Sequence, residues 1–144
     1  MILIDANLLL YSYHPRAEQH QASRAWLEAA LSGSEVLRLA WLTVWAFLRI
    51  STNPRVFEAP LTRGEAQAAV SAWLARPIAG ILEPGDRYWE IFRGLMNEGQ
   101  ATGPMVMDAA LAALAVEHGA TLHTTDRDFS RFPGLKWRNP IAPR

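Results

Sequence analysis

The sequence predicts an α/β fold in which a short, mainly parallel sheet carries helices on both faces. Short apolar segments typical of buried parallel strands alternate with longer segments that have helical periodicity or helix-capping residues. No linker, internal repeat or low-complexity stretch separates these segments. The chain has 144 residues, half of them hydrophobic, which suits one core. We therefore expect a single domain over residues 1–144.

The first strand and the first helix show contrasting patterns. Residues 1–4 are all apolar, as in a strand buried on both faces of a sheet, and Asp5-Ala6-Asn7 ends this strand. Residues 16–31 have apolar side chains at helical spacing, and Ser32-Gly33-Ser34 stops that helix. The inward face of the helix is expected to carry Ala22, Ala25, Trp26 and Ala29.

A second strand and two more helices follow. Residues 36–39 predict the strand, and residues 42–52 predict a helix that is apolar nearly all round and therefore expected to be buried. Asn53-Pro54 ends that helix, because a residue before proline avoids the α region. Thr62 and Glu65 have the spacing of a capping box, which begins a helix running to about Leu74.

The second half of the chain continues the alternation. Residues 79–82 give a weak third strand, and Asp86 is expected to cap a helix that runs to Asn97. Gly103-Pro104 and Gly119 bracket a further helix over residues 104–118. A fourth strand is expected over residues 121–125 and a short edge strand over residues 136–138.

Three aspartates fall where such a sheet brings distant residues together. Asp5 follows the first strand, Asp126 follows the fourth, and Asp108 lies in the first turns of the helix over residues 104–118. Taken singly, each has a structural interpretation, as a turn residue, a helix cap or a partner of the helix dipole. Ligands of parallel sheets bind beyond the carboxyl ends of the strands, so we expect the three carboxylates to converge.

Converging carboxylates need a positive charge beside them. Two of them within about 4 Å repel each other by about 1 kcal/mol in water, and by several times that value at a lower effective dielectric constant. They either take up protons or bind a cation, and oxygen ligands suit Mg²⁺. Such an ion lowers the pKa of a bound water and offsets charge on a phosphoryl oxygen, as phosphodiester cleavage requires.

Weaker candidates surround these aspartates in the sequence. Asn7, Thr124 and Thr125 could orient a carboxylate or bind a phosphate, although Asn in turns and Thr in strands are ordinary structural choices. Some arginines are candidates for contacts with a phosphate backbone. They are Arg49, Arg55, Arg127 and Arg131, with Arg49 and Arg127 considered first.

Composition excludes several classes of protein. The net charge is zero, which argues against a broad electrostatic nucleic-acid binder. There is no cysteine, hence no disulfide framework, zinc thiolate site or catalytic thiol. The longest uncharged apolar run, residues 39–48, is too short to span a bilayer, and the N-terminus lacks a signal-peptide pattern. We expect a cytoplasmic protein without membrane association.

Several motifs resemble those of PIN-domain ribonucleases of the VapC toxin type. The opening segment Ile2 to Asn7 and the Phe-Leu-Arg-Ile-Ser-Thr-Asn-Pro-Arg stretch from Phe47 to Arg55 are two of them. Residues 108–140 carry the rest, and Thr-Thr-Asp-Arg-Asp-Phe over residues 124–129 is the most specific. The resemblance extends over the whole chain in order and in length.

The resemblance implies a three-layer α/β/α PIN-like fold and a magnesium- or manganese-dependent endoribonuclease. In the family, positions matching Asp5, Asp108 and Asp126 are catalytic and hold the metal, and Asp128 would be auxiliary. Asn7 and Thr125 are further auxiliary candidates. The resemblance also implies the toxin of a type II toxin–antitoxin pair, which cuts RNA, forms a homodimer and binds a cognate antitoxin protein.

One position departs from the family pattern. The family often has a glutamate three residues after a threonine in the second helix, whereas here Thr43 is followed by Ala46 at that spacing. Losing one carboxylate reduces ligand charge and predicts weaker cation binding. The alternative hypothesis is therefore a diverged, non-catalytic PIN module that binds RNA or protein. A phosphotransfer enzyme is disfavoured, because the single lysine, Lys136, lies in no motif.

Overall fold

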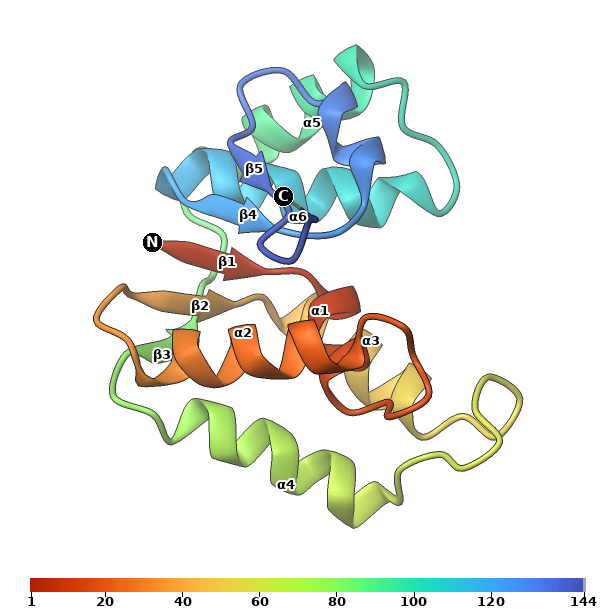
Figure 1. Cartoon of the computed structure of the whole chain (residues 1–144). Coiled ribbons are helices and arrows are strands. Elements are labelled where there is room, and N and C mark those ends of the chain that lie inside the picture. Colours follow the sequence, from red (N-terminus) through yellow and green to blue (C-terminus); the bar gives the residue numbers. More distant parts are fainter. Residues whose placement is uncertain (144) are drawn as a thin grey trace.

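In the computed structural model, which describes residues 1–143, the strands form a five-stranded, all-parallel sheet in the order β3-β2-β1-β4-β5 (Figure 1). The expected α/β class is confirmed. The strands are β1 (Ile2–Ile4), β2 (Leu37–Leu39), β3 (Ala79–Ile81), β4 (Thr121–His123) and β5 (Trp137–Arg138). The helices are α1 (Ala6–Ser12), α2 (His20–Ser32), α3 (Trp41–Ser51), α4 (Arg63–Leu74), α5 (Tyr88–Glu98) and α6 (Met105–His118).

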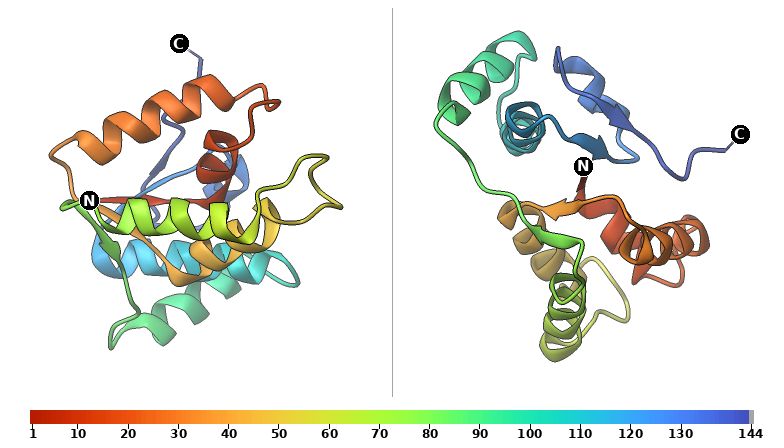
Figure 2. Two further views of the ribbon diagram at one scale, coloured as in Figure 1. Left: turned by 90° about the horizontal axis from the view of Figure 1, so that it is seen from below. Right: turned by 90° about the vertical axis from the view of Figure 1, so that its left-hand side faces the viewer.

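Two apolar clusters lie on the two faces of the sheet. Leu3 and Leu122 point toward α5 and α6, whereas Ile2 and Ile4 belong to a cluster with α1, α2, α3 and α4. Because successive side chains of a strand point to opposite faces, a strand between two helix layers must be apolar at every position. Figure 2 shows α1 and α2 on one side of the sheet and α5 and α6 on the other.

Several predicted helix boundaries are confirmed. The capping box forms, since Thr62 accepts a hydrogen bond from the Glu65 amide at 3.1 Å and the Glu65 carboxylate accepts one from the Thr62 amide at 2.9 Å. Helix α6 ends at Gly119, whose φ of 66° is left-handed and suits a residue without a Cβ atom. Within residues 1–143, no helix is long and apolar enough to cross a membrane.

Helix α1 was not predicted from the sequence. The Asp5-Ala6-Asn7 segment ends β1 as expected, but Ala6 already begins a helix of seven residues. Asp5 caps it, because its Oδ1 accepts a hydrogen bond from the Ala6 amide at 2.8 Å. A helix of two turns is too short to show a clear apolar period. Its stability comes from packing against α2 and α3 rather than from local propensity.

The predicted inward face of α2 is wrong. Ser23 and Leu27 are buried and Trp26 is partly buried. The alanines expected to face inward, Ala22, Ala25 and Ala29, are exposed, and the helix begins at His20 rather than at residue 16. Leu27 has more apolar area to remove from water than any alanine, so it sets the rotation of the helix.

Helix α3 is buried along one side only. Val44 and Phe47 belong to the core, whereas Trp41 is 42% and Trp45 is 62% exposed. The expectation that this helix is buried therefore holds for one side only. A helix placed at the end of the sheet has too few neighbours to cover an apolar surface on every side.

The start of α5 differs from the prediction. Asp86 does not cap it, since the helix begins at Tyr88 and no side chain caps it. Instead the Glu117 carboxylate, from the last turn of α6, accepts hydrogen bonds from the amides of Gly85 at 2.7 Å and Arg87 at 3.0 Å. The Glu117 side chain is only 9% exposed. A distant residue thus performs the function that the sequence assigned to a neighbour.

We predict that Glu117→Ala lowers the free energy of unfolding by about 2 kcal/mol, because it leaves two amides of the β3–α5 loop without acceptors. Urea denaturation followed by circular dichroism measures this change. Glu83→Ala, at an exposed position of the same loop, is the matched control and should change stability by less than about 0.5 kcal/mol. Equal stability of both variants would contradict the role given to Glu117.

Candidate active site

Two of the three predicted acidic residues, Asp5 and Asp108, line one cavity, and Asp126 follows the carboxyl end of β4. Strands β1 and β4 are neighbours in the sheet, with Ile4 aligned to His123, so Asp5 and Thr124 emerge side by side. Asp108 approaches from the first turn of α6. In Figure 1, α1 and α3 both begin at this end of the sheet. The pairing of β1 with β4 thus fixes the positions of the two strand ends from which Asp5 and Thr124 emerge.

Thr124 is the centre of a hydrogen-bond network at this site. Its side chain is fully buried, and its hydroxyl donates to Asp5 Oδ2 at 2.7 Å. The same oxygen accepts from the Asn7 side-chain amide at 3.2 Å and from the Asp126 backbone amide at 3.0 Å. One buried hydroxyl therefore connects both strand ends and fixes the orientation of the Asp5 carboxylate.

Asp126 begins the short 3₁₀ helix from Arg127 to Arg131. Its Oδ1 accepts a hydrogen bond from the Asp128 amide at 2.8 Å. The capping hydrogen bond occupies only one carboxylate oxygen of Asp126. Asp126 can therefore cap this helix and still present its second oxygen near the other acids. Asp128 itself is exposed on the outside of this turn.

Electrostatic strain is concentrated on Asp108. Its pKa is raised to about 6, first by burial and then by repulsion from Asp5, Asp126 and Asp128, while the charge of Arg131 acts in the opposite direction. Burial also raises the pKa of Asp5, although hydrogen bonds from Thr124 and the Ala6 amide act in the other direction. The charge of Asp126 raises the pKa of Asp5 further. The charges of Asp5 and Asp126 therefore act on Asp108, and the charge of Asp126 also acts on Asp5.

Asp5 and Asp108 line a common cavity of about 320 Å³. Arg49, Trp45 and Ala46 from α3 line the same cavity. Ala46, where the family often has glutamate, thus lies at the acidic site rather than elsewhere on α3. Thr43 also lines this cavity, is 1% exposed, and has a hydroxyl without a hydrogen-bond partner among residues 1–143.

Carboxylates are the ligand type that a hard divalent cation prefers, but these carboxylates do not form a complete coordination site by themselves. Carboxylates that repel one another and hold raised pKa values gain stability from a cation in their midst. Across the described part of the chain, however, no three acidic or histidine side chains are close enough together to hold a metal ion by themselves. Asp126 does not line the cavity of Asp5 and Asp108, so water would complete any ligand set.

The remaining predicted residues are placed unevenly. Arg49 lines the acidic cavity, whereas Arg127 is exposed and lines no cavity described for residues 1–143. Thr125 is half-buried, and its side chain makes no hydrogen bond within those residues. The hydrogen bond to Asp5 comes from Thr124 instead. The sequence analysis undervalued Arg131. Its guanidinium donates a hydrogen bond to the Gly99 carbonyl at 3.1 Å, and its charge acts to lower the pKa of Asp108.

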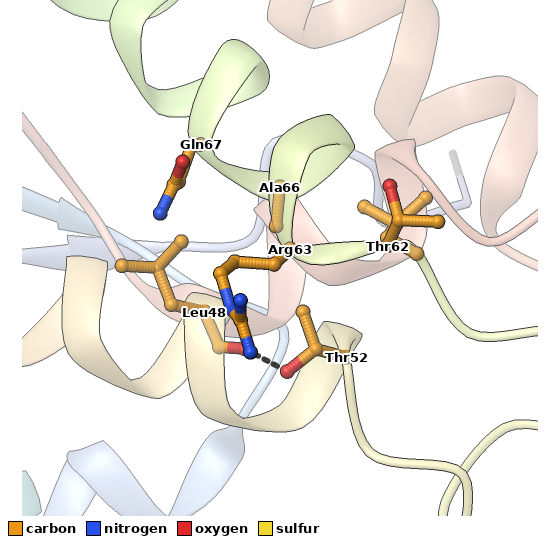
Figure 3. A pocket seen from close by; sticks show the side chains of 7 residues that line it. Leu48, Thr52, Thr62, Arg63, Ala66 and Gln67 are labelled. Atoms are coloured by element: carbon orange, nitrogen blue, oxygen red, sulfur yellow. Dashed lines mark hydrogen bonds between the residues drawn. The ribbon is translucent and has the colours of Figure 1, made fainter.

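A larger cavity, of about 440 Å³, lies between α3 and α4 (Figure 3). Leu48 and Thr52 form its α3 side, and Arg63 and Gln67 lie on the α4 side. The Thr52 hydroxyl donates to the Leu48 carbonyl at 2.6 Å, so it is already satisfied within its helix. No acidic side chain lines this cavity, and it is separate from the site of Asp5 and Asp108.

Comparison with known proteins identifies the family. Residues 2–135 match the family model described as PIN domain, so the chain belongs to this family. It is 40% identical over 142 residues to Ribonuclease VapC37 of Mycobacterium tuberculosis, with 99% of each protein covered. It is also 40% identical over 141 residues to the VapC ribonuclease Mb2897 of Mycobacterium bovis, with 98% of this chain and 96% of that relative covered. The resemblance noted in the sequence is confirmed.

A solved structure gives independent support for the fold. The chain matches a structure of VapBC2 from Rickettsia felis bound to a DNA fragment of its promoter, with a TM-score of 0.68. The match covers 96% of this chain and 98% of that chain at 17% identity. Likeness at such low identity shows the shared fold, which is the three-layer PIN architecture.

We predict that Asp108→Asn stabilises the metal-free protein at pH 8 but not at pH 4. The folded state holds the Asp108 proton more tightly than the unfolded state does, so stability is lost as the pH rises from about 3.8 to about 6. Solvent screening at a half-buried group leaves roughly 1 kcal/mol of this cost.

Thermal unfolding in EDTA at pH 4 and pH 8 measures this difference. The melting temperature of Asp108→Asn should exceed that of the unchanged protein by a few degrees at pH 8 only. Asp86→Asn, an exposed aspartate outside the site, should show no such dependence on pH. A less stable Asp108→Asn at pH 8 would show that the ionised carboxylate is not strained.

Proposed function

We propose that this protein is a divalent-metal-dependent endoribonuclease and the toxin of a toxin–antitoxin pair. The observation that carries the proposal is the cavity shared by Asp5 and Asp108, in which the charge of Asp126 acts on both. Relatives named ribonucleases, 40% identical over nearly the full length, support the reaction class. The substrate is RNA, and the bond broken is a phosphodiester.

Each residue of the site has a distinct task in this proposal. Asp5 and Asp108 hold Mg²⁺ or Mn²⁺, with Asp126 acting directly or through water. When bound, the ion lowers the pKa of an attacking water and offsets charge on the phosphoryl oxygens. Thr124 and the Ala6 amide each hold one oxygen of Asp5, so its carboxylate is oriented before a ligand arrives.

Arg49 is placed to hold the substrate backbone. It lines the acidic cavity together with Asp108, and its guanidinium can bind a phosphate in a bidentate manner. Such contacts fix the position of the strand without reading its sequence. The zero net charge of the chain makes a local arginine of this kind more important, because no broad basic surface attracts RNA.

The proposal includes a cognate antitoxin, a homodimer and action in the cytoplasm. An antitoxin that covers the acidic cavity would exclude RNA from it. The solved structure that the chain matches is that of VapBC2, which supports the pairing. Exposed tryptophans on α3 and α5 supply an apolar surface for a second copy, and these are Trp41, Trp45 and Trp89.

A second candidate function is a non-catalytic PIN module, and Ala46 is the observation that favours it. Its methyl group lies in the wall of the acidic cavity, where a glutamate would add a further ligand. With one carboxylate fewer, the cation is held more weakly. Such a module would bind RNA or protein through the same cavity without cutting.

We predict that Asp5→Asn abolishes RNA cleavage while the fold survives. The amide keeps the size and polarity of the side chain but removes a charged ligand, so the rate should fall about 100-fold or more. Purified, antitoxin-free protein is incubated with structured RNAs and Mg²⁺ or Mn²⁺, and fragments are followed on denaturing gels.

The controls separate the mechanism from contamination. EDTA should stop cleavage by the unchanged protein, and Asp86→Asn should cleave as fast as the unchanged protein does. Circular dichroism confirms that Asp5→Asn is folded. Undiminished metal-dependent cleavage by Asp5→Asn would exclude this mechanism. Absence of cleavage by the unchanged protein with every RNA and both metals would favour the binding module.

Ala46→Glu tests the missing ligand. The added carboxylate faces the cavity, so the metal concentration that gives half-maximal cleavage should fall about 10-fold. A titration of cleavage rate against Mn²⁺ measures it, with Ala46→Gln as the uncharged control of similar size. An unchanged midpoint for Ala46→Glu would show that a carboxylate at this position is dispensable here.

A further inference from the structure

A further cavity, of about 360 Å³ and with a mixed polar and apolar lining, lies between α2 and the strands β1, β4 and β5. Ile2 and the turn residues Gly33 and Ser34 border it, and these lie near the amino ends of β1 and β2. Asp5 lies beyond the opposite, carboxyl end of β1. His123 and Arg138 lie at the carboxyl ends of β4 and β5, but this cavity shares no lining residue with the acidic cavity, so a ligand here would leave the acidic cavity open.

An aromatic pair forms one wall of this cavity. The rings of Trp26 on α2 and His123 on β4 are stacked, with centroids 5.4 Å apart and planes 27° from parallel. Both residues line the cavity, and Trp26 is only partly buried. A flat ring system can stack against such a wall as nucleobases do on aromatic side chains.

Opposite charges stand at the rim. Glu35 and Arg138 both line the cavity, and both are exposed to solvent. The N-terminal ammonium group of Met1 lies 3.3 Å from Oε2 of Glu35 in an ion pair at the surface. Arg138 is aligned with His123 through the pairing of β5 with β4. The cavity thus has a carboxylate that accepts hydrogen bonds, from Glu35, and a guanidinium that donates them, from Arg138, beside an aromatic wall.

His123 gives an independent sign of a ligand. It is 6% exposed, and its Nδ1 atom is buried without a hydrogen-bond partner among residues 1–143. An unsatisfied buried polar atom destabilises a fold, so packing alone would favour an apolar residue at this position. The imidazole ring stacks on Trp26, and His123 lines the cavity.

We propose that this cavity binds a guanine base. Guanine offers neighbouring N–H donors to a carboxylate, and its O6 and N7 atoms accept a bidentate contact from arginine. Glu35 and Arg138 supply these partners, and Trp26 supplies the stacking surface. The mixed rim disfavours other ligands, because Glu35 repels an isolated phosphate and Arg138 repels a cation. This proposal does not depend on the ribonuclease activity.

Calorimetric titration of the unchanged protein with GMP, AMP, CMP and UMP, in EDTA, tests the proposal. GMP should bind at one site, about ten-fold more tightly than the other nucleotides. Arg138→Ala and Trp26→Leu should each weaken GMP binding about ten-fold. Glu35→Gln should remove the preference for GMP over AMP. Equal affinity for all nucleotides would overturn the assignment to guanine.

Control variants show where GMP binds. Arg63→Ala removes an arginine from the separate cavity in Figure 3 and should leave GMP affinity unchanged. Asp5→Asn should also leave it unchanged, because the Asp5 side chain lines the acidic cavity and not this one. If Trp26→Leu does not fold, Trp26→Phe retains a ring and Arg138→Ala alters only an exposed side chain. Loss of GMP affinity in Arg63→Ala or Asp5→Asn, or no saturation at millimolar GMP, would refute the site.

A second set of titrations distinguishes between an RNA nucleotide and a free nucleotide as the source of the guanine base. Short unstructured RNAs with one guanosine, and matched RNAs with adenosine in its place, are titrated into Asp5→Asn so that nothing is cut. Tighter binding of the guanosine RNA than of GMP, weakened by Arg138→Ala, indicates a substrate nucleotide far from the cleaved bond. Preference for GMP over the RNA indicates a free nucleotide. Both outcomes support the cavity as a guanine site, and failure of both refutes it.

Discussion

The parallel pairing of β1 with β4 is the constraint on which the site depends. Its register aligns Ile4 with His123, and the Asp5 amide donates to the His123 carbonyl at 3.0 Å. The next residue of each chain segment, Asp5 and Thr124, then meets the other across the end of the sheet. A slip of one residue would turn Thr124 away and would also move Ile2 and Ile4 out of their cluster. The core therefore enforces the geometry of the site.

This arrangement concentrates negative charge in a protein whose net charge is zero. Burial and mutual repulsion raise the pKa values of Asp5 and Asp108, so the apo protein stores electrostatic strain at this point. The fully buried hydroxyl of Thr124 relieves part of it by bonding to Asp5. A bound divalent cation would relieve the rest, which couples metal affinity to stability. Ala46 lowers the repulsion and the ligand charge together.

Local signals predicted the elements whose boundaries are set by their own residues. The capping box at Thr62 and the left-handed Gly119 are such cases, because the partners lie within one helical turn. Asp86 was misassigned because the acceptor for this loop is Glu117, which lies 32 residues beyond Gly85. Helix α1 was missed because seven residues hold too little periodicity. The inward face of α2 was misread because alanines carry a weak apolar signal.

The candidate site shows the same division. The sequence alone determined that Asp5, Asp108 and Asp126 follow strands or begin a helix, since apolar runs, glycine and proline mark those positions locally. It also determined the family, through motifs that are contiguous in the chain. Only the tertiary structure decided that Thr124 rather than Thr125 bonds Asp5, that Ala46 and Arg49 line the acidic cavity, and that Trp26 stacks on His123. The physical reason is that these contacts join segments far apart in the chain, and their geometry is set by how the sheet and helices pack rather than by neighbouring residues.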